Sequence, residues 1–326
     1  MKQSPESPLK SPKEIFLEPK NHKELLEVFE QKEKLPLGEK LRFKGIGNRD
    51  VYNIAAPFKV ENETYIAGRV ESRSTTQDAQ TLFFVEKDGV WQPDQSLPTF
   101  KLEDPFLTKI NKEIIFGGVQ TYPLPDRKDA GKLGYRTIFY RGKNLQNLRQ
   151  FGTGPDLMKD IRLIELPEKK IGVFTRPQGK IGNRGKVGFI KLNSLEELTA
   201  DNILKAKLIE RQFCENEWGG TNELHLLKNG DIGALGHIAN QDENGKKHYS
   251  AMTFLFNPET FKSSSIKIIA TRKNFPKGET KESDHLEDVV FPGGLIINPD
   301  QTATLYTGLS DAEAGRINLP NPFPAN

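Results

Sequence analysis

From about residue 40 onward, short apolar runs alternate with groups of Gly, Asn, Asp and Pro, and helical periodicity is nearly absent. Such runs, rich in β-branched and aromatic residues and bounded by turn formers, are typical of β-strands. Seven of them stand out, at residues 65–70, 81–85, 136–140, 171–175, 186–190, 252–256 and 302–306. Many short strands at even spacing predict an all-β sandwich, barrel or propeller.

A segment near the N-terminus has helical periodicity instead. Asn21 is followed three residues later by Glu24, which is the spacing of a capping box, and apolar residues within 25–29 form one face. The pattern predicts a helix over 21–33 that packs on the main body and ends before Pro36.

A coarse repeat decides between the β architectures. Each of five stretches places a polar, often acidic, residue just before an apolar strand, at 53–58, 104–107, 160–164, 222–226 and 288–292. By subtraction, their first positions are 51, 56, 62 and 66 residues apart. Each step holds one four-stranded blade and a loop, so the repeat predicts a five-bladed β-propeller. The innermost strands are expected to begin at a common axis, where the five polar residues converge.

Composition narrows the class of protein. The chain has 326 residues, with 47 basic against 44 acidic side chains, so its charge favours neither a nucleic acid nor a membrane surface as partner. Its single cysteine, Cys214, excludes an intramolecular disulfide, suits a reducing compartment and is expected to be buried. Residues 1–12 are expected to be poorly ordered and lack the apolar run of a secretory signal. We therefore expect a soluble, cytoplasmic protein without a membrane span.

Two adjacent carboxylates, Glu103 and Asp104, stand directly before Pro105. A residue before proline is biased toward extended geometry, so Asp104 is expected in extended backbone at the start of a strand. Residues 106–107 and 114–116 then read as a strand, a turn and a second strand. A carboxylate fixed at the mouth of a strand suits a proton donor. An isolated stretch of this kind would more simply be a solvated acidic turn.

Ten motifs in fixed order carry a family resemblance. They are Val51–Ala55, Gly68–Glu71, Asp104–Phe106, Gly117–Val119, Met158–Arg162, Phe174–Gly179, Trp218–Glu223, Gly236–Ala239, Phe291–Gly294 and Tyr306–Asp311. Over about residues 43 to 323, the series resembles glycosyltransferase family 108, the β-1,2-mannosyltransferase/phosphorylase family. It is more distantly similar to the mannoside phosphorylases of glycoside hydrolase family 130, whose hallmark is Glu-Asp-Pro-Arg. This chain has Phe106 in place of that Arg, which removes a sugar or phosphate contact.

The resemblance implies a five-bladed propeller at residues 41–326 as the catalytic domain, preceded by a tail and helix at 1–40. It implies transfer of mannose, with inversion, between β-1,2-mannooligosaccharides and either inorganic phosphate, giving mannose 1-phosphate, or GDP-mannose. No cofactor is expected. No metal is predicted either, because the acidic residues around His285 follow no recognisable ligand spacing.

A phosphorylase needs an acid and a set of cations, because phosphate is already a nucleophile at neutral pH. Asp104 is assigned as proton donor in phosphorolysis and as base in synthesis, with Glu103 in a supporting role. In the related phosphorylases the proton is thought to pass through a substrate hydroxyl. Phosphate is predicted to bind Lys159, Arg176 and His237, since Arg grips it with two parallel bonds, Lys is a point charge and His is a donor.

Polar groups at the axis ends of the strands are predicted to bind the mannose hydroxyls: Asn53, Arg69, Asp160, Asn222, Glu223, Asp288 and Asp311. Other interpretations stay open for single residues. Arg176 would also fit a surface ion pair, and His237 would fit a core imidazole. Trp218 would serve either sugar stacking or core packing.

Two other functions remain open on the sequence. A hydrolase of the same linkage needs a base carboxylate opposite Asp104, for which Glu223 is the candidate. A non-catalytic mannan-binding propeller would bind the sugar without turning it over.

Overall fold

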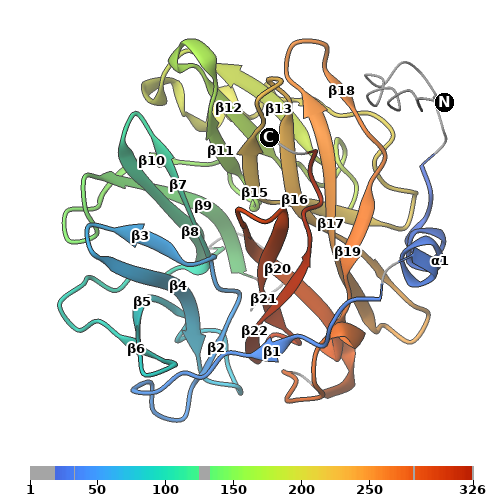
Figure 1. Cartoon of the computed structure of the whole chain (residues 1–326). Coiled ribbons are helices and arrows are strands. Elements are labelled where there is room, and N and C mark those ends of the chain that lie inside the picture. The colour runs from blue at the N-terminus through green and yellow to red at the C-terminus, as the bar shows by residue number, and fades with distance from the viewer. Residues whose placement is uncertain (1–18, 33, 125–132, 282, 325–326) are drawn as a thin grey trace, which may run out of the picture.

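The computed structural model describes residues 19–32, 34–124, 133–281 and 283–324. Its regular structure is almost entirely β, and the strands follow one another around the molecule in chain order (Figure 1). The fold is therefore all-β and propeller-like, as the spacing of the apolar runs predicted. No helix in the described part of the chain is long and apolar enough to cross a membrane.

Three sheets are antiparallel, with strands in chain order. The first contains β2 (Asp50–Tyr52), β4 (Glu63–Glu71), β5 (Gln80–Lys87) and β6 (Val90–Pro93), with β3 (Phe58–Val60) beside β4. The second contains β7 (Glu103–Ile110), β8 (Glu113–Pro123), β9 (Leu133–Gly142) and β10 (Arg149–Thr153). The third contains β11 (Arg162–Glu165), β12 (Ile171–Thr175), β13 (Gly188–Leu192) and β14 (Lys207–Leu208).

The fourth sheet has nine strands and joins two antiparallel runs. One run contains β15 (Trp218–Leu226), β16 (Ile232–Gln241) and β17 (Lys247–Asn257), with β18 (Lys262–Ser263) and β19 (Lys267–Ala270) beside β17. The other contains β20 (Asp288–Ile297), β21 (Thr302–Leu309), β22 (Glu313–Pro320) and β1 (Glu39–Lys40). A short parallel pairing of β17 with β20 connects the two runs, and β1 brings the N-terminal side of the chain onto the last strand.

The predicted apolar runs lie in strands, with one difference at 186–190, where β13 begins only at Gly188. The predicted hairpin is confirmed: Asn111 and Lys112, with φ of 52° and 66°, form the two-residue turn between β7 and β8. Short helices occupy some of the connections: η1 (Pro167–Lys169), η2 (Leu195–Glu197), α2 (Ala200–Ile203), η3 (Arg272–Asn274) and η4 (Ser283–Leu286).

Aromatic side chains pack between neighbouring sheets. The ring centroids of Phe83 and Phe116 lie 5.3 Å apart and join the first sheet to the second. Those of Phe174 and Phe256 lie 5.5 Å apart and join the third to the fourth. Close packing of this kind holds the sheets in fixed relative positions, and with them the side chains that their first strands carry.

The predicted helix is present as α1 (His22–Lys32). Its first turn is closed by the capping box: the Asn21 N–H donates to Glu24 over 2.8 Å, and the Glu24 N–H donates to Asn21 over 2.9 Å. The helix packs against β16 and β19. The expectation for residues 1–12 lies outside the described residues.

His22, the first residue of α1, is 2% exposed, and its Nε2 lies 2.9 Å from Ser250 Oγ. Burial lowers its pKa from 6.5 to about 4. As the pH falls from 6.5 toward 4, His22 is protonated in the unfolded chain but stays neutral in the folded state. The folded state therefore loses up to about 3 kcal/mol of stability over this range. His22→Gln should flatten the acid dependence of the urea midpoint relative to that of the wild-type protein. Unchanged acid sensitivity in His22→Gln would contradict this assignment.

Candidate active site

The polar residues lie where the first strand of a sheet ends, begins or bulges. Asn53 follows β2 with a φ of 44°, Asp104 lies within β7 with a φ of 47°, and Asp160 precedes β11 with a φ of 59°. Asn222 lies in a β-bulge of β15. Positive φ is uncommon for residues other than glycine, and bulges redirect side chains. Such strained positions cluster at functional sites, and the contacts below show that these four side chains gather.

The backbone prediction for Asp104 is wrong. A bulge interrupts the pairing of β7 with β8 between Glu103 and Phe106, and Asp104 within it has a left-handed rather than an extended φ. The tertiary contacts of its carboxylate therefore override the local preference that Pro105 imposes. The strand itself begins at Glu103, as expected.

The carboxylate of Asp104 is 4% exposed and has three polar neighbours. Its Oδ1 accepts hydrogen bonds from Asn53 Nδ2 over 2.8 Å and from Arg69 Nη1 over 3.1 Å. Its Oδ2 lies 3.8 Å from Lys159 Nζ. The same Arg69 Nη1 lies 3.1 Å from Glu103 Oε2, so one cation serves both acids.

The pKa of Asp104 is shifted in the opposite direction from those of its acidic neighbours Glu103 and Asp311. Burial opposes the charge of Asp104, but Arg69 and Lys159 outweigh it and hold its pKa below the ordinary value. Burial raises the pKa of Glu103, and it also raises the pKa of Asp311, which follows β21 with a φ of 49° and interacts with Arg69 and Asp104. Asp104 is thus a carboxylate in the free protein at neutral pH.

A second group adjoins Asp104 through Lys159. Arg176 Nη1 donates to Asp160 Oδ2 over 2.9 Å, and both side chains are buried. Although burial opposes its charge, Arg176 and His237 help to lower the pKa of Asp160 to about 2. Burial lowers the pKa of His237 to about 3, and its Nδ1 lies 2.9 Å from Asn222 Oδ1. His237 is therefore a neutral imidazole with one nitrogen already engaged.

A cavity of about 440 Å³ opens beside these residues. Its walls include the predicted phosphate ligands Lys159, Arg176 and His237 together with Asp160. The cavity has further lining residues to which the sequence analysis assigned no role in the site, among them Gln178, Asn183, Arg184, Lys247, Tyr249 and Phe291. The phosphate candidates and the proton-donor candidate thus lie in one region.

Several buried polar atoms of this region have no hydrogen-bond partner among the described residues: Asn53 Oδ1, Asp160 Oδ1, Arg176 Nε and Asn222 Nδ2. Buried polar groups are rarely left unpaired, so such a concentration indicates a place for a polar ligand or ordered water. Gly220 lets the group pack closely, because a Cβ there would lie 3.0 Å from Asp160 Oδ2. A Cβ at Gly308 would lie 2.2 Å from Asn53 Oδ1.

The structure places Glu223 away from these residues. Its Oε2 accepts a hydrogen bond from the Leu295 N–H over 2.6 Å and lies 2.9 Å from His225 Nε2. Glu223 lines a separate cavity of about 240 Å³, whose walls include Phe106 and Ile296. The predicted base for a hydrolase therefore does not face the cavity that Lys159 and Arg176 line.

Asp288 also lies apart from this cluster. It is the first residue of β20, and its Oδ2 lies 2.7 Å from His248 Nδ1. The bulge of β20 comes later, between Pro292 and Gly294, so the repeat had the wrong register in the last run of strands. The residue in that bulge is Gly293, where a Cβ would lie 1.5 Å from the Ile54 carbonyl oxygen, so no side chain fits.

Packing bears on two other expectations. Trp218 lines the same cavity but is 4% exposed, and the Arg184 guanidinium already lies 3.8 Å from its ring centroid. Cys214 is half-buried rather than fully buried. Sequence reasoning missed Glu71, although it lies two residues from Arg69 on the same face of β4, a spacing that alternation along a strand makes visible.

Within the ranges that the structure describes, no three His, Cys, Asp or Glu side chains are arranged to hold a metal ion.

Comparison with known proteins places the chain among sugar-active enzymes. Residues 27–325 match the family described as Protein of unknown function (DUF1861). No curated protein sequence matches the chain.

Solved structures give closer likenesses. A mannose phosphorylase from Leishmania mexicana in complex with phosphate ion is 36% identical, with 92% of this chain and 93% of that chain covered and a TM-score of 0.83. A GDP-Man-dependent mannosyltransferase from the same organism is 35% identical, with 94% and 96% covered and a TM-score of 0.83. A β-1,2-mannobiose phosphorylase from Listeria innocua is 14% identical, with 88% and 95% covered and a TM-score of 0.61, and shares the fold.

Proposed function

Because this chain belongs to the DUF1861 family, which corresponds to glycosyltransferase family 108, and is an enzyme of the glycosyltransferase type, we propose that it is an inverting β-1,2-mannoside phosphorylase. It moves mannose between β-1,2-mannooligosaccharides and inorganic phosphate, giving α-mannose 1-phosphate. One observation carries the proposal: Lys159, Arg176 and His237 line one cavity, and Lys159 lies 3.8 Å from the buried carboxylate of Asp104.

In the phosphorolytic direction, a phosphate oxygen bonds to the anomeric carbon while the bond from that carbon to the glycosidic oxygen breaks. The proton that the leaving oxygen needs is balanced by the one that hydrogen phosphate brings. Asp104, ionised in the free protein, takes up this proton and passes it on, directly or through a mannose hydroxyl. Bound phosphate shares the charge of Lys159, which raises the proton affinity of Asp104 when a proton is needed.

Arg176 and Lys159 hold the phosphate by charge. Burial keeps His237 neutral and its Nδ1–H donates to Asn222 Oδ1, so its Nε2 is an acceptor that the hydroxyl of hydrogen phosphate can donate to. Asn53, Arg69, Asp160, Asn222 and Asp311 remain proposed contacts for mannose hydroxyls. Glu223 and Asp288 are less suited to that role because of their positions.

We also propose five blades. Dividing the nine-stranded sheet at its short parallel pairing gives five groups of antiparallel strands, with β1 completing the last. The domain division, 1–40 and 41–326, and the cytoplasmic location stay predictions.

The test is to incubate the protein with β-1,2-mannobiose and phosphate and to follow products by NMR. Formation of α-mannose 1-phosphate with inversion supports the proposal. Transfer from GDP-mannose to a β-1,2-mannan acceptor, without phosphorolysis, would replace it by the transferase, a candidate favoured by the extra cations Arg184 and Lys247 in the cavity wall. Free mannose without phosphate would indicate a hydrolase, and binding without turnover would indicate a sugar-binding protein.

A further inference from the structure

Behind Asp104, the Arg69 guanidinium links Glu71 to the acid pair Glu103 and Asp104. Arg69 donates from Nε and Nη2 to Glu71 Oε2, over 3.0 and 2.8 Å. Its Nη1 lies 3.1 Å from both Asp104 Oδ1 and Glu103 Oε2. A planar guanidinium bound along one edge has a fixed orientation at the other. Glu71 therefore determines where Arg69 directs its remaining N–H group.

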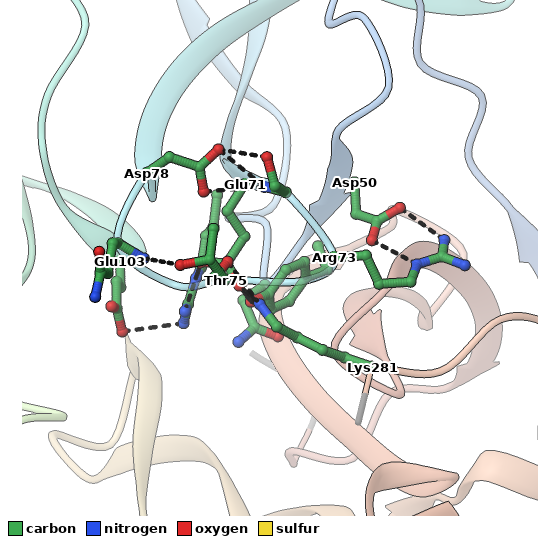
Figure 2. A network of polar contacts seen from close by, with 12 residues as sticks. Asp50, Glu71, Arg73, Thr75, Asp78, Glu103 and Lys281 are labelled. Carbon is green, nitrogen blue, oxygen red and sulfur yellow. Dashed lines mark hydrogen bonds and ion pairs between the residues drawn. The ribbon is translucent and has the colours of Figure 1, made fainter. Parts of the chain in front are cut away.

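Glu71 is itself neutralised from another part of the chain. Its Oε1 is contacted by the Lys281 ammonium and accepts a hydrogen bond from the Tyr52 hydroxyl. Lys281 Nζ also lies 3.4 Å from Tyr52 Oη and 3.5 Å from the Thr75 carbonyl oxygen. Figure 2 shows Lys281 directed at Glu71, with Glu103 on the opposite side of that carboxylate.

These groups are withdrawn from water: Glu71 is 0% exposed, Tyr52 1% and Lys281 4%. Burying two opposite charges carries a desolvation cost that only close pairing offsets, so a buried pair is weak evidence for stability alone. The proposed reaction uses neither charge. Lys281 is held in place because its N–H donates to the Ser310 carbonyl over 3.0 Å, directly before Asp311.

We propose that Glu71 and Lys281 are positioning residues whose ion pair fixes the orientation of Arg69 and sets the positive charge that Arg69 presents to Glu103 and Asp104. This inference rests on the proposed acid–base role of Asp104. Each of the two charges acts on Asp104 through Arg69, so removing one has the opposite electrostatic effect from removing the other.

The charged and titratable groups that act on Asp104 come from several elements. They are Tyr52 from β2, Arg69 from β4, Glu103 beside it, Lys159, Asp160 and Arg162 around the start of β11, and Asp311 after β21. Arg69 and Tyr52 contact the pair directly, and the substitutions leave the other groups in place, so a change in the titration of Asp104 reports the pair acting through these two side chains.

The test compares Glu71→Gln with Lys281→Met. The amide introduced by Glu71→Gln keeps a carbonyl acceptor for Arg69 but loses the negative charge, so the pKa of Asp104 should fall by about one unit; in Lys281→Met it should rise by a similar amount. Two readouts apply: the acid limb of the kcat profile, and the carbon-13 NMR titration of the Asp104 carboxyl, assigned with Asp104→Asn. If Lys281→Met does not fold, the double variant Glu71→Gln with Lys281→Met replaces it, because that variant leaves neither charge of the pair unpaired. The pKa of Asp104 should be higher in the double variant than in Glu71→Gln alone.

A matched control lies on the same two segments, two residues away from each member of the pair. Arg73 and Glu279 form an exposed ion pair of 2.6 Å on the outer side, and Glu279→Gln should leave both readouts unchanged. If the two variants shift the pKa of Asp104 in the same direction, or if folded variants show no shift, the inference is overturned and the pair has only a structural role. A wild-type protein that makes no mannose 1-phosphate would refute the proposed function instead, and the NMR titration would still decide between shift and no shift.

Discussion

Asp104→Asn is expected to lower the kcat of phosphorolysis by about 10²–10⁴-fold, the usual contribution of a positioned acid–base group. The amide cannot take up and release the proton that the leaving oxygen requires. It keeps the size of the carboxylate and still offers Oδ1 to Asn53 and Arg69, so the fold should survive. Rates of α-mannose 1-phosphate release measure the loss, and circular dichroism checks the fold.

Phosphate binding separates this role from a structural one. Removing the negative charge near Lys159 should leave phosphate affinity unchanged or tighter, as measured by calorimetry. Asp50→Asn, a change at an exposed ion pair with Arg73, serves as the control and should retain activity. An Asp104→Asn enzyme with wild-type kcat would show that another group moves the proton.

Arg176→Met is expected to lower the free energy of unfolding by about 3–5 kcal/mol, because it leaves the buried carboxylate of Asp160 without its closest cation. It should also raise the KM for phosphate at least about tenfold, since a charged hydrogen bond to the ligand is lost. Urea denaturation and initial rates at varied phosphate measure the two effects.

The double variant Arg176→Met with Asp160→Asn removes the unpaired charge and should recover much of the stability but none of the phosphate affinity. Lys191→Met, at a partly exposed ion pair with Glu259 of 2.6 Å, is the matched control and should cost at most about 1 kcal/mol. Equal losses at the two ion pairs would contradict the buried-charge argument.

Much of this site could be predicted because the first strand of each sheet was expected to begin at the same end of the molecule. Polar residues placed before successive apolar runs had to meet there if the runs formed the inner strands. Asn53, Asp104, Asp160 and Asn222 do so through a chain of contacts that passes by Lys159 and His237.

The parts of the site that the sequence did not predict lie in β-bulges or in connections without hydrophobic periodicity. Counting from Asp288 missed the later bulge at Gly293, because hydrophobic pattern does not locate an extra residue in a strand. Asn222 lies in a bulge of β15, where regular alternation fails, so the sequence did not show which of Asn222 and Glu223 joins the cluster. Lys281 lies outside any strand, and only tertiary contacts bring it to Glu71.

The pairing of β1 with β22 has a consequence for how the molecule is made. The last group of strands stays incomplete until Arg316 can pair with Glu39, which lies 277 positions earlier in the chain. Closing so long a loop is slow and costly in chain entropy, so we expect it to come late in folding. A growing chain that has not reached Arg316 lacks this closure, and one that has not reached Lys281 also lacks the contact with Glu71.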